Sequence, residues 1–62
     1  MSNFEKSARK IVEKHGCTFI KMVGECRVLW KNKYGYESID DIFVLNNMCD
    51  SAWEFWSNYN PV

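Results

Sequence analysis

The chain has 62 residues, 47% hydrophobic and 16% aromatic. This composition excludes intrinsic disorder, and the length leaves room for one small domain over residues 1–62. All eight Lys and Arg residues lie at or before Lys33, with only three carboxylates beside them, a local balance of +5. The other five carboxylates follow and give the second part −5. Such an asymmetry bears on partners rather than on fold, because opposed charges steer association.

Charges interrupt the first twenty residues, and no stretch is long and apolar enough to cross a membrane. We therefore expect neither a secretory signal nor a membrane partner. The three cysteines are an odd number, which favours a reducing compartment over a disulfide framework. Together with the initiating Met, these features indicate a complete small gene product in the cytoplasm.

The first predicted element is an amphipathic helix between Ser2 and Gly16. Ser2 and Glu5 have the spacing of a capping box, and a glycine follows the last turn. Residues at helical spacing form one stripe, namely Phe4, Ala8, Ile11, Val12 and His15. Most remaining positions are basic, so we expect a helix that packs on the core and has a basic back.

A hairpin follows, with strands at residues 17–23 and 26–31 that are rich in β-branched and aromatic side chains. Gly24 and Glu25 between them predict a two-residue type II′ turn. This turn pairs Val23 with Cys26, and Phe19 with Trp30. The face then expected on the core side consists of Cys17, Phe19, Val23, Cys26, Val28 and Trp30, interrupted by Lys21.

The opposite face of the hairpin is the predicted binding surface. Its apolar centre is Ile20, Met22 and Leu29, framed by Thr18, Arg27 and Lys31. An apolar centre with a basic rim is typical of a binding patch, and a small sheet rarely has helices enough to cover both faces. The alternative is that the tryptophan-rich C-terminal segment folds across this face and buries it.

Residues 32–36 have a turn composition, and residues 36–38 could add a short third strand. One helix is then expected to begin near Ser38, and a second near Ser51, where Glu54 completes a capping box. Their apolar residues are Ile39, Ile42, Phe43, Leu45 and Met48 in the first, and Trp53, Phe55, Trp56 and Tyr59 in the second. The acidic clusters have two open explanations, helix capping or a partner surface.

The predicted fold class is therefore α+β, a small αββ(β)α(α) domain in which helices cover an antiparallel hairpin sheet. Its predicted core comprises Phe4, Ile11, Val12, Phe19, Val28, Trp30, Ile42 and Phe43, with one or both of Trp53 and Trp56.

Metal binding and catalysis have little support in the sequence. His15, Cys17, Cys26 and Cys49 could form a Cys3His site, but zinc ligands usually come in close pairs, and only the first two are close. The predicted register separates Cys17 from Cys26 by about 20 Å, too far for a disulfide. No phosphate-binding glycine loop, serine elbow or dinucleotide fingerprint is present. We expect structural thiols, no metal, no cofactor and no enzymatic activity.

Residues 27–36 (RVLWKNKYGY) and 41–49 (DIFVLNNMC) resemble treble-clef-type repeats of phage proteins and homing-endonuclease-associated proteins. Those repeats carry a C-x-x-G-H knuckle and a closing C-x-x-C pair, of which this chain retains only Gly35 and Cys49. The resemblance spans residues 4–52 and implies a metal-free relative of a nucleic-acid-associated module.

We expect a non-enzymatic interaction protein, such as a small inhibitor or adaptor of the kind phages encode, that binds a host macromolecule. A protein partner is favoured, and the acidic and basic halves of two copies could also pair as a homodimer. The predicted binding residues are Ile20, Met22, Arg27, Leu29, Lys31, Lys33, Tyr34 and Tyr36. The alternative is a small nucleic-acid-binding protein that uses the basic N-terminal half, with Tyr34 or Tyr36 stacking on a base.

Overall fold

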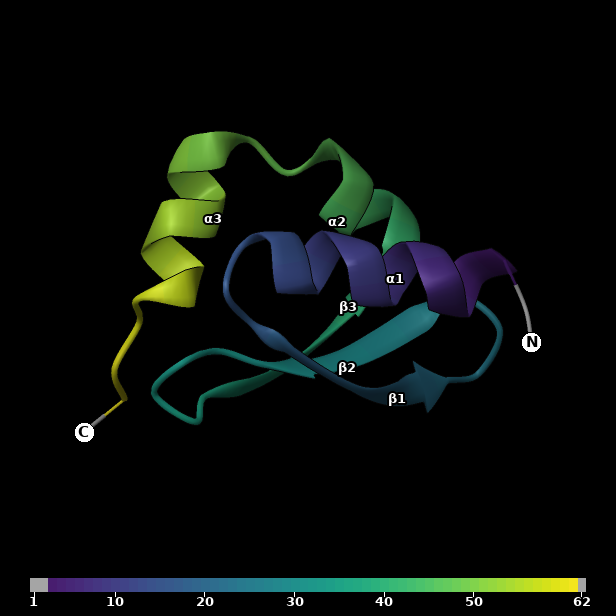
Figure 1. The fold of residues 1–62 in the computed structure, drawn as a ribbon, viewed down its shortest axis with the longest axis horizontal. Helices are drawn as coiled ribbons and strands as arrows, with labels where there is room; N and C mark the ends of the chain where they lie inside the picture. The colour runs from purple at the N-terminus through teal and green to yellow at the C-terminus, as the bar shows by residue number, and fades with distance from the viewer. Residues whose placement is uncertain (1–2, 62) are drawn as a thin grey trace.

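The structure is a computed structural model and describes residues 3–61. Its elements, in chain order, are α1 (Asn3–Lys14), β1 (Thr18–Val23), β2 (Arg27–Lys31), β3 (Glu37–Asp41), α2 (Ile42–Asn47) and α3 (Asp50–Ser57) (Figure 1). The predicted α+β class is confirmed. The third strand is longer than expected, because it runs through Ser38 to Asp41. Ser2, the predicted cap of the first helix, lies outside the described residues.

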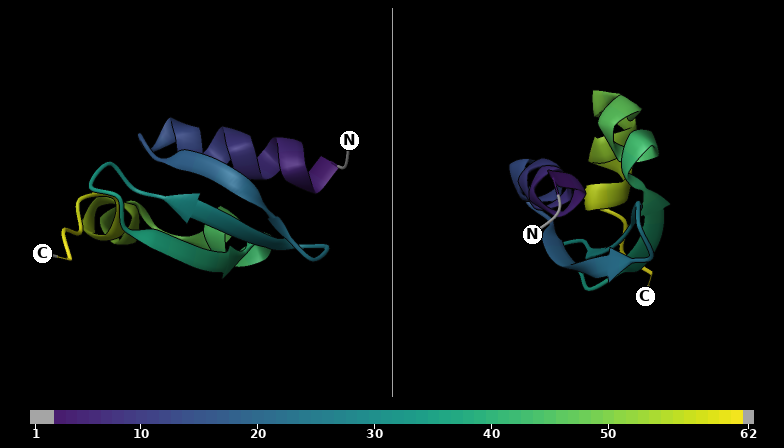
Figure 2. Two further views of the ribbon diagram at one scale, coloured as in Figure 1. Left: turned by 90° about the horizontal axis from the view of Figure 1, so that it is seen from below. Right: turned by 90° about the vertical axis from the view of Figure 1, so that its right-hand side faces the viewer.

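The three strands form one antiparallel sheet in the order β1-β2-β3. All three helices lie on the same side of this sheet, which curves around them (Figures 1 and 2). The ring of Trp53 in α3 lies 5.4 Å from that of Trp30 in β2, on the core side. The alternative in which the C-terminal segment covers the other face of the sheet is therefore wrong. None of the helices in the described part of the chain lies on that other face (Figure 2).

The hairpin register follows the prediction at one end only. Phe19 pairs with Trp30 as expected, but a bulge between Phe19 and Lys21 inserts Ile20 as an extra residue. Beyond the bulge Met22 pairs with Val28, and the connection to β2 has three residues rather than two. The bulge turns Met22 toward the core in place of Lys21, whose ammonium group would lose its hydration there.

The core lies between the sheet and the three helices. Its buried residues are Ala8, Val12, Cys17, Phe19, Val28, Trp30, Ile42, Leu45 and Trp53, and Ile11, Met22, Cys26 and Met48 pack against it. Most of the predicted core is confirmed, but Phe4 and Phe43 are 40% and 56% exposed and meet edge to face at 5.8 Å.

The Oδ1 atom of Asp41 accepts the N–H of Phe43 at 2.8 Å. Because this cap starts α2 at Ile42, the residues that turn inward are Ile42 and Leu45.

The C-terminal helix is joined to the sheet through one buried amide. Asn32, only 2% exposed, accepts the N–H groups of Tyr34 and Tyr36 on Oδ1, each at 2.9 Å. Its Nδ2 atom donates to the carbonyls of Trp56 and Tyr59 at 2.8 and 2.7 Å. The β2–β3 turn therefore holds the end of α3 in place.

The start of α3 also differs from the prediction. The helix begins at Asp50, and its N-cap residue is Cys49 rather than Ser51. Ser51 lies within the first turn, where its hydroxyl is 3.2 Å from the sulfur of Cys49.

Candidate functional site

The uncovered side of the sheet is the first candidate site. Val28 and Trp30 are buried against the helices, so the alternating residues of β2 face away from them. Their partners on β3 are fixed by the register, which pairs Arg27 with Asp41, Leu29 with Ile39, and Lys31 with Glu37. These six residues, and as a seventh Lys21 of β1, which pairs with Leu29, are called the outer face.

The centre of the outer face is apolar. Leu29 is half-buried, and Ile39 beside it is 55% exposed. Ile20 is 38% exposed and lies at the bulge of β1, on the other side of β2 from Ile39. Single exposed apolar residues are common on protein surfaces, but Leu29 and Ile39 are cross-strand neighbours on a face that no helix within residues 3–61 covers.

The rim of the outer face is mixed rather than basic. Arg27 lies directly opposite Asp41, and Lys31 directly opposite Glu37. Opposite charges on facing positions of neighbouring strands stabilise the pairing. With Lys21 as a third cation against two carboxylates, the face is close to electrically balanced.

The predicted binding residues fall into four places. Ile20, Arg27, Leu29 and Lys31 come together on or beside the outer face, as expected. Met22 is a wrong prediction, because the bulge places it opposite Val28 and against the core.

The other three predicted residues follow β2. Lys33 and Tyr34 are exposed in the β2–β3 turn, beyond the end of the outer face. Tyr36 lies on the helical side, where its ring stacks on that of Trp56 at 5.9 Å. It therefore belongs to a different site.

Ile39 is an apolar outer-face residue that the sequence interpretation missed. The order Glu-Ser-Ile-Asp-Asp over residues 37–41 places Ile39 and two charges on one side of a strand. The predicted helix start near Ser38 conceals this period of two. The cap is Asp41 itself.

The basic residues do not form a single surface. Lys6, Lys10 and Lys14 are exposed on α1, on the helical side of the sheet, whereas Lys21, Arg27 and Lys31 belong to the outer face (Figure 2). The guanidinium carbon of Arg9 lies 4.8 Å above the ring of Phe19, so this cation also contributes to packing.

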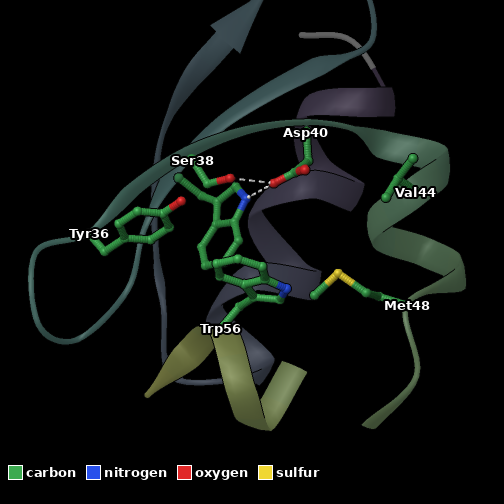
Figure 3. A pocket seen from close by; sticks show the side chains of 7 residues that line it. Tyr36, Ser38, Asp40, Val44, Met48 and Trp56 are labelled. Atoms are coloured by element: carbon green, nitrogen blue, oxygen red, sulfur yellow. Dashed lines mark hydrogen bonds between the residues drawn. The ribbon is translucent and has the colours of Figure 1, made fainter. Parts of the chain in front are cut away.

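A pocket of about 360 Å³ opens on the helical side of the sheet (Figure 3). Its walls come from β2, β3, α2 and α3 and consist of Trp30, Tyr36, Ser38, Asp40, Val44, Met48 and Trp56. The Oδ2 atom of Asp40 accepts two hydrogen bonds, from Trp30 Nε1 at 2.9 Å and from Ser38 Oγ at 2.7 Å. Asp40 and Asp41 are neighbours in β3 but have separate partners, because the Asp41 carboxylate accepts the N–H of Phe43 and the thiol of Cys26.

The three cysteines are free thiols in different environments. Burial raises the pKa of the Cys17 thiol. The hydrogen bond from Cys26 to the carboxylate of Asp41, 3.2 Å long, raises the pKa of the Cys26 thiol. The pKa of the Cys49 thiol is lowered, chiefly by the hydroxyl of Ser51.

Within residues 3–61, no three His, Cys, Asp or Glu side chains are grouped as a metal ion would require. In the same part of the chain, none of the helices has the length and apolar character needed to span a bilayer.

Comparison of the chain with protein-family models, with curated proteins and with solved structures finds no match in any of the three. The resemblance to treble-clef-type repeats therefore stays a prediction.

Proposed function

We propose that this protein is a non-enzymatic binding module that attaches to another protein through the outer face of its sheet. The observation that carries the proposal is the one-sided architecture, in which three helices cover one face and leave Ile39 exposed on the other, with Ile20 exposed at the bulge of β1. Burial of such apolar side chains is the usual driving force of protein association. The flanking charges would fix the orientation of the partner rather than supply most of the affinity.

The shape of the outer face favours a different protein over a second copy. The sheet curves around its helices, so the outer face is convex (Figure 2). Two convex faces touch only near their centres, whereas a concave surface or an extended segment of another protein can follow the curvature of a convex face. The three strands have six, five and five residues, so the sheet covers only about 250 Å². A stable interface buries about 800 Å² per partner. The partner must therefore reach beyond the face to its edges.

The balance of charges favours a protein over a nucleic acid. Arg27 and Lys31 each have a carboxylate in the facing position, which weakens the attraction for a phosphate backbone. The exposed lysines of α1 belong to another side of the molecule. A role of this kind is that of a small inhibitor or adaptor, which acts by occupying a surface of its target.

The test is affinity capture from a lysate of cells that contain the protein, with three forms as bait. Ile39→Lys adds a cation at the centre of the outer face, where the exposed fraction is 55%. Phe43→Lys makes the same chemical change at a position that is 56% exposed on the helical side. We expect the wild type and Phe43→Lys to retain the same protein and Ile39→Lys to lose it by about tenfold or more, the loss expected from one desolvated charge.

Two results would contradict the proposal. Equal capture by all three forms would show that the outer face is not the contact. Loss of capture after nuclease treatment would support the nucleic-acid alternative. Sedimentation of the pure protein at low and high salt tests for a homodimer. A dimer that dissociates at high salt would indicate that the basic half of one copy pairs with the acidic half of another.

A further inference from the structure

We propose that the pocket between β3, α2 and α3 is a site for an alkylammonium group, carried either by a lysine side chain or by a small free amine. The site is separate from the outer face, because it opens on the helical side of the sheet (Figure 3). Its volume of about 360 Å³ lies within the range of small-ligand sites.

The charge in the pocket comes from Asp40. Both hydrogen bonds that this carboxylate accepts end on Oδ2, and both donors are neutral, the indole of Trp30 and the hydroxyl of Ser38. These bonds fix the orientation of the carboxylate but do not neutralise it. Neither of them uses Oδ1. A partly buried anion held in this way is well placed to attract a cation.

The aromatic walls favour the same ligand. Trp30, Tyr36 and Trp56 line the pocket, and the rings of Tyr36 and Trp56 stack at an angle of 16° with their centroids 5.9 Å apart. Aromatic faces carry negative potential, so they attract cations and disfavour anions. Trp56 remains 37% exposed, which leaves part of its ring open to a ligand.

The remaining wall suits an alkyl chain. Val44 is 53% exposed and Met48 is half-buried, and both come from the α2 side of the pocket. A ligand with an ammonium head near Asp40 could lay its methylene groups against these two side chains. The combination of one carboxylate, aromatic faces and an apolar wall therefore points to an alkylammonium rather than to an inorganic cation.

The proposal is tested by two-dimensional NMR of the ¹⁵N-labelled protein, which has three tryptophans. The probes are n-butylammonium chloride, the peptide acetyl-Gly-Lys-Gly-amide, and 1-pentanol as a neutral analogue of similar length. The indole N–H of Trp30 reports directly, because it donates to Asp40. We expect the cations to shift the Trp30 and Trp56 indole signals with dissociation constants of about 1–10 mM, and the signal of buried Trp53 to stay in place.

Asp40→Asn removes the charge while keeping an oxygen that can accept both hydrogen bonds, and it should weaken binding by about tenfold or more. Glu37→Gln is the matched control, because it removes one charge from the same strand on the outer face. Preferential binding of the peptide would identify a lysine side chain as the natural ligand, and preferential binding of the free amine would identify a small molecule. No shift with either cation, equal shifts with 1-pentanol, or unchanged binding by a folded Asp40→Asn protein would overturn the proposal.

Discussion

At the scale of single residues, Asn32 connects the sheet to the C-terminal helix. Its amide donates to carbonyls 24 and 27 positions later in the chain, and it also accepts two N–H groups of its own turn. Sequence patterns place Asn in turns, because its side chain can bond to the nearby backbone. They carry no information about the long-range pair of bonds, which depends on where α3 ends in space.

Replacement of Asn32 by alanine should lower the free energy of unfolding by about 2–4 kcal/mol, because buried donors and acceptors would be left without partners. The measurement is urea denaturation followed by tryptophan fluorescence. Asn58→Ala is the control, since the Asn58 amide makes one exposed hydrogen bond to Glu54 and its loss should cost no more than about 1 kcal/mol. Similar losses in the two variants would contradict the role given to Asn32.

The three thiols should react with iodoacetamide in an order set by their environments. The thiolate is the reactive form, so a lowered pKa moves the rise of the alkylation rate to lower pH and a raised pKa moves it to higher pH. Cys49 is exposed and has a lowered pKa, whereas the pKa of Cys26 is raised by Asp41 and that of Cys17 by burial.

We therefore expect Cys49 to react first, and its rate to rise at lower pH than that of Cys26. Peptide mass spectrometry across a pH series measures all three rates in one protein. Ser51→Ala should move the Cys49 profile to higher pH, because the hydroxyl of Ser51 is the main cause of its lowered pKa. A Cys49 profile that rises at the same pH as that of Cys26 would contradict these environments.

At the scale of elements, the hairpin shows what a turn rule can and cannot predict. The two strands, their pairing and the contact of Phe19 with Trp30 follow from composition and spacing. The bulge at Ile20 could not be predicted, because the same sequence is compatible with a two-residue turn and with a three-residue turn followed by a bulge. One inserted residue exchanges the two faces of a strand, so Lys21 and Met22 changed places.

This exchange predicts opposite costs for neighbouring substitutions. Met22→Asp should lower the free energy of unfolding by about 2–3 kcal/mol, because it places a carboxylate against the core. Lys21→Asp, on the outer face, should cost less than about 1 kcal/mol. Thermal or urea unfolding of the two variants makes the comparison, and a larger loss in the Lys21 variant would restore the register predicted from the sequence.

The helices were predictable to different extents. The apolar stripe of α1 identified Ala8 and Val12 correctly, because a long amphipathic pattern survives small errors at its ends. The starts of α2 and α3 were misplaced, since several Ser and Asp residues offered caps and only tertiary contacts select among them. Because the predicted helix began near Ser38, Phe43 was expected in the core, and the extension of the third strand through Ile39 was not expected.

At the scale of the whole molecule, the charge asymmetry of the sequence does not become two opposed surfaces. The fold divides the basic residues between α1 and the outer face, and it places Glu37 and Asp41 opposite two of them. An uncovered sheet face could be predicted from the number of helices, but its composition could not. The pocket could not be foreseen either, because its lining comes from four elements whose packing the sequence does not specify.

The most direct test of the proposed function is NMR mapping of the ¹⁵N-labelled protein with its captured partner. We predict that the backbone signals of Leu29, Ile39 and Lys31 shift or broaden most strongly, because they lie at the centre and rim of the outer face. The signals of α1 and α3, on the other side of the sheet, should change little. Changes confined to the helices, with the signals of β2 and β3 unmoved, would contradict the assignment of the outer face as the binding surface.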